Sequence, residues 1–212
     1  MHVPDGVLPI AVSAAGYATA GAATWYSLRK INQKENPQED VPKASLLTAA
    51  FFVASWIHIP IPPTSAHLVL NGLLGAVLGY YAFPAILIGL FFQAVMFQHG
   101  GLATLGVNAT IMGLPALLAY FIFRLRNIVG RDSRMWTGLF GSLAGASGIG
   151  VSVVIFSVLL ITFIPAHIDA EVERASIWAL SLSHVPLIII ESVFTALVVL
   201  FLHRVKPELL NG

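Results

Sequence analysis

The chain alternates between long apolar runs and short breaks that are polar or contain proline or glycine. The apolar runs fall at about 7–28, 44–59, 67–82, 84–98, 107–123, 136–164 and 179–203. A membrane-spanning helix needs about 20 residues, so these runs predict about seven transmembrane helices. The runs at 44–59 and 84–98 are short, and a bent or partly buried helix is the alternative there. The pattern predicts a single all-α integral membrane domain over residues 1–212.

The composition agrees with a chain that lies in a bilayer. Charged residues make up 10% and apolar residues 57% of the 212 residues, whereas soluble domains carry about a quarter charged residues. The net charge of +1 supplies no basic surface for nucleic acid. Cysteine is absent, which excludes disulfides, thiolate metal sites and cysteine nucleophiles. Histidine, carboxylate and backbone groups remain as metal ligands.

The basic residues predict the orientation in the membrane. They concentrate in three segments: Arg29, Lys30, Lys34 and Lys43 follow the first run, Arg124, Arg126, Arg131 and Arg134 follow the fifth, and Arg204 and Lys206 lie in the C-terminal tail. Seven spans place all three segments on one side, whereas six would divide them. The positive-inside rule then places the N-terminus outside and the C-terminus in the cytoplasm. The first run has no basic region before it, so we expect it to be retained rather than cleaved as a signal peptide.

Met1-His2 offers three nitrogen donors in a row: the terminal amine, the His2 amide and Nδ1 of the His2 imidazole. They can close fused five- and six-membered chelate rings in one plane. A planar nitrogen set suits Ni(II) or Cu(II) better than tetrahedral Zn(II) or the oxygen-preferring Mg(II). The best candidate for a fourth donor is His67, which begins the third run at the expected outer face. For each histidine alone, a solvated, capping or packed imidazole is the alternative interpretation.

Other polar residues lie at the outer level or inside the runs. His99 and His184 are candidate partners of the ligating imidazoles, which usually donate their second N–H to a neighbouring acceptor. Histidines bonded to interfacial water are the alternative. Glu191 is the only acid deep inside a run, so we expect it to face the interior, either offsetting a cation's charge or bridging two helices. Gln93 and Asn108 also need partners at membrane depth, and Asn108 is expected at the floor of a polar cavity.

With these residues identified, the chain resembles the CbiM/NikM family, most closely the nickel-binding NikM type. These proteins are the substrate-binding S components of energy-coupling-factor transporters for cobalt and nickel. The resemblance runs nearly end to end and is carried by the opening Met1 to Pro9, the stretch Thr64 to Leu68, the block from Gln93 to Met112, and the ending from His184 to Leu210.

The resemblance implies a ligand set, a fold and a set of partners. In the family the metal is held by the amine and amide of Met1 and His2, the His2 side chain and a further histidine, which matches His67. The implied fold is the S-component bundle with an extra N-terminal helix, whose leading residues fold into the bundle. The implied partners in the prokaryotic cell membrane are a transmembrane T subunit, two ATPase subunits and often a small accessory membrane subunit.

Three hypotheses of function follow. The first is a binding subunit for uptake of a divalent metal, nickel first and cobalt second, with no catalytic cofactor and no enzyme activity. The chain has no G-x-x-x-x-G-K-[ST] loop, so ATP hydrolysis is expected from partner subunits. The second is a proton-coupled metal carrier or intramembrane enzyme that uses Glu191 and the outer histidines. The third is a structural membrane subunit with an incidental Met-His start, which copurification with stoichiometric metal would exclude.

Overall fold

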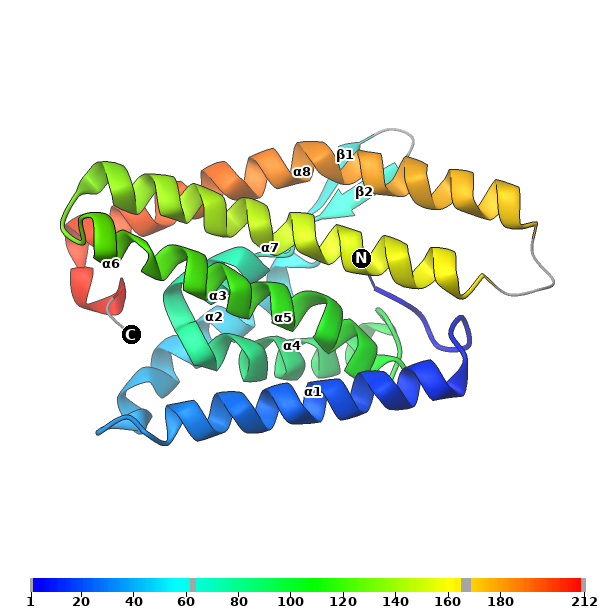
Figure 1. The fold of residues 1–212 in the computed structure, drawn as a ribbon, viewed down its shortest axis with the longest axis horizontal. Coiled ribbons are helices and arrows are strands. Elements are labelled where there is room, and N and C mark those ends of the chain that lie inside the picture. Colours follow the sequence, from blue (N-terminus) through cyan, green and yellow to red (C-terminus); the bar gives the residue numbers. More distant parts are fainter. Residues whose placement is uncertain (1, 62–63, 165–168, 211–212) are drawn as a thin grey trace.

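The computed structural model describes residues 2–61, 64–164 and 169–210 of the chain, which form a helical bundle with one short β-hairpin (Figure 1). In chain order the elements are α1 (Ile10–Ile31), η1 (Pro37–Asp40), α2 (Val41–Ala54), β1 (His58–Ile61), β2 (Thr64–His67), α3 (Asn71–Leu78), η2 (Gly79–Tyr81), α4 (Ala82–Phe97), α5 (Leu105–Arg124), α6 (Arg126–Val129), α7 (Arg134–Thr162), α8 (Ala170–Val205) and η3 (Pro207–Leu210). The η elements are 3₁₀ helices.

Helix α5 lies at the centre of the bundle, with α1, α3, α4 and α7 packed around it (Figure 1). Most of its side chains are buried, including Asn108 in the first turn and Phe123 in the last. Helices α7 and α8 run antiparallel along one side, while α1 covers the opposite side. This arrangement places the first turn of α5 inside the protein, where its polar side chains need protein partners.

Small residues let α3, α7 and α8 cross almost at backbone contact. A Cβ atom placed on Gly148 of α7 would lie 2.6 Å from the Cα of Gly72 in α3. One placed on Gly145 would lie 2.6 Å from the carbonyl oxygen of Glu191 in α8. Such close approach is how apolar helices gain packing energy in a membrane, where burial from water contributes little. It also brings Glu191 next to the beginning of α3.

Four helical stretches among the described residues are long and apolar enough to cross a membrane, namely Asn71–Phe97, Leu105–Val129, Arg134–Thr162 and Ala170–Val205. This is fewer than the seven expected from the sequence. The stretch Asn71–Phe97 covers most of both runs expected at 67–82 and 84–98, but the chain turns back within it. Gly79, with a φ of +59°, follows the end of α3, and the ring centroids of His67 before α3 and His99 after α4 lie 5.2 Å apart. Pro84 lies in the first turn of α4, where its missing N–H has no helical partner to lose.

The described residues confirm a helical bundle and add a short β-hairpin to it. The run expected to be helical over 44–59 leaves the helix at Ala54 and continues as β1, which pairs antiparallel with β2. Each strand of a two-stranded hairpin is an edge strand, so Pro60, which cannot donate a hydrogen bond, is tolerated there. The register places His67 at the end of the hairpin, opposite His58, immediately before the chain enters α3.

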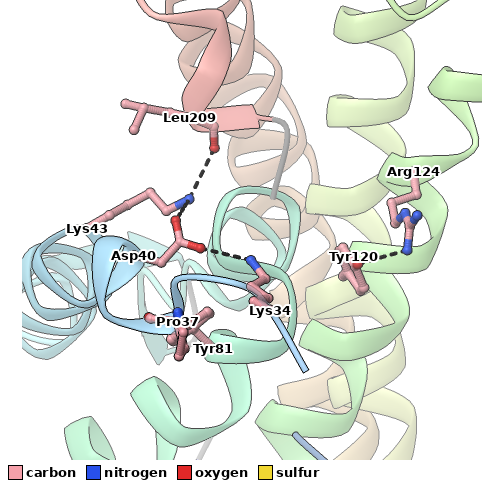
Figure 2. A network of polar contacts seen from close by, with 8 residues as sticks. All are labelled: Lys34, Pro37, Asp40, Lys43, Tyr81, Tyr120, Arg124 and Leu209. Carbon is pink, nitrogen blue, oxygen red and sulfur yellow. Dashed lines mark hydrogen bonds and ion pairs between the residues drawn. The ribbon is translucent and has the colours of Figure 1, made fainter. Parts of the chain in front are cut away.

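A polar network closes the end of the bundle where α1 and α2 are connected (Figure 2). Asp40 lies between two lysines, with Lys34 Nζ at 2.8 Å and Lys43 Nζ at 2.9 Å from its carboxylate oxygens. Burial raises the pKa of Asp40, but hydrogen bonds from the two lysines outweigh burial and hold it below its ordinary value. Lys43 also donates to the carbonyl of Leu209 at 3.3 Å. The network therefore ties the C-terminal η3 to the α1–α2 connection.

Candidate metal centre

The leading residues 2–9 turn back from the start of α1 into the bundle, as the resemblance implied (Figure 1). Val3 is fully buried, and its N–H donates to Oδ1 of Asn108 at 2.8 Å. The Val3 carbonyl accepts from Nδ2 of Asn108 at 3.0 Å and from Oγ1 of Thr104 at 2.7 Å. The side-chain amide of Asn108 thus pairs with the Val3 backbone on both sides, as a neighbouring strand would. It fixes the residue that follows His2.

Asp5 and the turn at Gly100-Gly101, the double-glycine turn, hold the leading segment at a second point. Oδ1 of Asp5 accepts from the backbone N–H of Thr104 at 3.0 Å and from its hydroxyl at 3.2 Å. Gly100 has a φ of +87°, which strains residues with a side chain, and a Cβ on Gly101 would overlap the Asp5 carboxylate. Both glycines are therefore needed for the segment to lie against this turn.

The hydrogen bond of His2 decides which of its ring nitrogens can bind a metal. Nε2 of His2 bonds to Oε1 of Gln93 at 2.9 Å. An amide oxygen only accepts, so Nε2 carries the proton and Nδ1 carries the lone pair. Nδ1 is buried and has no hydrogen-bond partner among the described residues. Burial, together with the neighbouring imidazoles, holds the pKa of His2 well below its ordinary value, which favours the neutral, ligating form.

Three histidines from distant parts of the chain meet at this point. The ring centroid of His2 lies 5.3 Å from that of His67 and 4.1 Å from that of His99. One nitrogen from each ring lies within 4.8 Å of the others. Three donors that each lie about 2.1 Å from one zinc-sized ion are about 3.6 Å apart when evenly spaced around it. The three imidazoles would therefore have to move closer together to bind one ion.

The hydrogen bond of His67 also favours the tautomer that can bind a metal through Nε2. Its Nδ1 bonds to the carbonyl oxygen of Leu68 at 3.0 Å. Because a carbonyl only accepts, Nδ1 carries the proton and the lone pair lies on Nε2. Backbone acceptors of this kind commonly fix the tautomer and direction of metal-binding imidazoles.

The structure brings together most of the residues that the sequence singled out for the metal. His2 and His67 are neighbours, and Asn108 supports the residue next to His2. His99, predicted as a partner of a ligand, instead belongs to the group of three possible ligands. Met1, predicted to supply the terminal amine, lies outside the described residues.

Two of the predicted supporting residues do not belong to the group of three histidines. Nδ1 of His184 bonds to the carbonyl of Leu180 in its own helix at 2.7 Å. Glu191 accepts hydrogen bonds from the backbone of Val69 and Leu70. Among the described residues, neither joins the cluster that could hold an ion. Glu191 therefore links α8 to the segment before α3, whereas the sequence predicted either a bridge between two helices or a charge that offsets a cation.

Sequence reasoning missed the pairing of Asp5 with Thr104 and could not name the partner of Gln93. The only signal for Gln93 was a polar side chain at membrane depth, and the structure shows that it bonds to His2. Asp5 and Thr104 are 99 residues apart, and no local pattern connects them.

With this geometry established, comparison with known proteins identifies the chain's relatives. Residues 2–209 match the family model described as cobalt uptake substrate-specific transmembrane region, CbiM. The chain belongs to the CbiM family. It is therefore a multi-pass membrane protein of a family of cobalt and nickel transport components.

The CbiM relatives include proteins described for both metals. A metal transport protein of Haemophilus influenzae is 35% identical over 215 residues, which cover 100% of this chain and 97% of that protein. The cobalt transport protein CbiM of Geobacter sulfurreducens is 26% identical, with 99% of this chain and 61% of that protein covered. The fused nickel transport protein NikMN of Rhodobacter capsulatus is 31% identical, with 99% and 64% covered.

Solved structures agree with the CbiM assignment. The crystal structure of a transition metal transporter has a TM-score of 0.80 and 26% identity, covering 97% of this chain and 93% of that one. A truncated transition metal transporter has a TM-score of 0.79 and 26% identity, covering 95% and 98%.

Proposed function

We propose that this CbiM protein captures one divalent transition-metal ion, Ni²⁺ in preference to Co²⁺, through the Met1 amine, the His2 amide, Nδ1 of His2 and Nε2 of His67. The observation that carries the proposal is the buried Nδ1 of His2. It has no hydrogen-bond partner among the described residues and lies beside two further imidazoles. A buried polar atom without a partner is costly, and a bound ion would remove that cost.

The proposed donor set supports nickel as the first choice. The Met1 amine, the His2 amide and Nδ1 of His2 can close fused chelate rings in one plane, and Nε2 of His67 would complete a set of four nitrogens. A plane of nitrogen donors suits Ni(II), and His99 is a nearby further donor through which Co(II) could also be accepted.

The proposed role is substrate capture within a larger transporter, not catalysis. We expect a transmembrane T subunit, two ATPase subunits and, where used, a small accessory membrane subunit to supply energy and release. The N-terminus and the metal centre are proposed to face outward. The basic end of the bundle, with the Asp40 network, is then proposed to face the cytoplasm, following the distribution of lysine and arginine.

Titration calorimetry of the purified protein in detergent tests the proposal. We expect one Ni²⁺ per chain, with Co²⁺ binding more weakly. Replacing His67 by alanine should weaken nickel binding by about 100-fold, or about 2.8 kcal/mol, because one of four donors is lost. His203→Ala, at the basic end of α8, is the matched control and should bind like the unmodified protein. Absence of nickel binding by the unmodified protein would refute the proposed function.

Nickel affinity should fall in acid. Binding requires loss of a proton from the terminal amine, whose ordinary pKa is about 8, and from the His2 amide. Burial holds the pKa of His2 well below its ordinary value, which favours the neutral imidazole, so the amine and the amide are expected to set this limit. For each proton that nickel displaces, the apparent affinity should fall about tenfold for every unit by which the pH is lowered. Calorimetry in buffers of different ionisation enthalpy would count these protons, and release of none would contradict the chelate.

A further inference from the structure

Glu191 is a buried acid whose hydrogen bonds go to the polypeptide backbone. Its side chain lies in α8 and is 0% exposed. The carboxylate accepts from the N–H of Val69 and, at 2.8 Å, from the N–H of Leu70. Among the described residues it forms no ion pair with lysine or arginine. Two consecutive backbone N–H groups therefore supply hydrogen bonds to a carboxyl group that would otherwise be buried without partners.

The carboxylate holds the backbone immediately before α3. Leu70 immediately precedes α3, has a left-handed φ of +55°, and provides no side-chain hydrogen bond to the helix. The N–H groups that Glu191 binds are those of Val69 and Leu70, whereas within the first turn the N–H of Gly72 donates to Oδ1 of Asn71 at 2.9 Å. Glu191 thus stabilises, from α8, the segment that leads into α3.

This segment begins at a proposed metal ligand. His67 precedes Val69 by two residues, and the chain between them has a support on each side. On one side, β1 pairs with β2, and the N–H of Leu68 donates to the carbonyl of Ile57 at 3.4 Å. On the other side lies the Glu191 carboxylate. A change at either support would turn the backbone that carries the His67 imidazole.

Asn71 fixes the first turn of α3, but it does not bind the backbone N–H groups of residues 69 and 70. Its Nδ2 donates to the carbonyl of Gly148 at 3.0 Å and to Oγ of Ser152 at 2.9 Å, both in α7. It also donates to the carbonyl of Met112 in α5 at 3.2 Å. These contacts fix the position of α3, whereas the N–H groups of Val69 and Leu70 are bound by α8.

We propose that Glu191 is a positioning residue for the metal centre, which holds residues 68–70 so that His67 points at His2. The inference rests on the function proposed above. Glu191 acts through the backbone and does not contact the ion, which distinguishes it from a metal ligand and from a proton carrier.

Glu191→Gln tests the inference with almost no change in volume. Glutamine keeps one acceptor oxygen but replaces the other by an NH₂ group, so one of the two backbone N–H groups loses its acceptor. We expect nickel affinity to fall by about 10- to 100-fold, the usual effect of removing support from a metal ligand. The nickel K-edge absorption spectrum should show fewer bound imidazoles. Size-exclusion chromatography checks that the variant is folded.

Ser192→Ala is the matched control on the same helix. Ser192 bonds to the Ser142 hydroxyl at 2.7 Å and to its carbonyl at 3.1 Å, so this variant loosens α7–α8 packing without touching residues 68–70. Its affinity and spectrum should stay unchanged. An equal loss in both variants would overturn the inference, because it would indicate a general packing effect.

A double-mutant cycle decides whether Glu191 acts through His67. In a His67→Ala background, Glu191→Gln should cost nothing further, because the positioned side chain is already absent. Additive losses in the double mutant would overturn the inference. So would an unchanged nickel affinity and spectrum in Glu191→Gln. A Glu191→Gln variant that loses transport but keeps its nickel affinity would overturn it as well. If Glu191→Gln does not fold, Glu191→Asp, which shortens the support by one methylene, takes its place in the same cycle. Failure of the unmodified protein to bind nickel would instead refute the proposed function.

Discussion

One residue added ahead of Met1 should abolish high-affinity nickel binding. The extension converts the terminal amine into an amide and removes the donor that begins the proposed chelate. It also lengthens a segment that has little room to shift, since Val3 is fully buried and bonded to Asn108 on both sides of its backbone. We expect a loss of at least about 1,000-fold, or about 4 kcal/mol, in calorimetric titration with nickel.

The control for the extension is the same residue added after Gly212, at the opposite end of the chain. This variant should bind nickel like the unmodified protein. Equal affinity of the two extended proteins would show that the terminal amine is not a ligand. Mass spectrometry of each purified protein confirms that the added residue is still present.

Replacement of His2 by alanine should be about as damaging as the extension. The change removes Nδ1, which closes the six-membered ring of the chelate, and leaves Gln93 without its partner. We expect a loss of about 1,000-fold in nickel affinity, or about 4 kcal/mol. In contrast, His99→Ala should cost about tenfold or less, because His99 lies beside His2 but is not one of the four proposed donors.

His184→Ala is the matched control for these two variants. The His184 imidazole is buried but bonds within α8, and among the described residues it does not join the three histidines. It should leave nickel affinity unchanged. If His99→Ala proved as damaging as His2→Ala, the planar arrangement would be wrong and His99 would be a principal ligand.

The long apolar helices could be predicted from the sequence because their signal is local. The runs at 136–164 and 179–203 correspond to α7 and α8. The β-hairpin could not be predicted this way, because the residues of β1 continue an apolar run and pair with β2 only through contacts across the turn. Pro84 marks a break in sequence but is accommodated inside the first turn of α4.

Parts of the site could be predicted from the sequence where the chemistry of one or two adjacent residues was enough to indicate metal binding. Met1-His2 is a chelating pattern by itself, and the structure orients His2 as that pattern requires. The role of Met1 as a ligand stays a prediction. His99 lies next to His2 only because a double-glycine turn packs against the leading segment, which no periodic pattern shows. Glu191 was correctly expected to face the interior, but its backbone partners depend on the glycine crossing of α7 with α8.

The long-range bonds that hold the leading segment also determine when the metal centre can form. Val3 and Asn108 are separated by 105 residues, and Val69 and Glu191 by 122. Chains are synthesised from the N-terminus at about 5–20 residues per second, so His2 leaves the ribosome long before the helices that position it. A nascent chain that ends after α7 would carry His2, His67 and His99 and still lack Glu191. Tight nickel capture would therefore mark molecules whose synthesis and membrane insertion are complete.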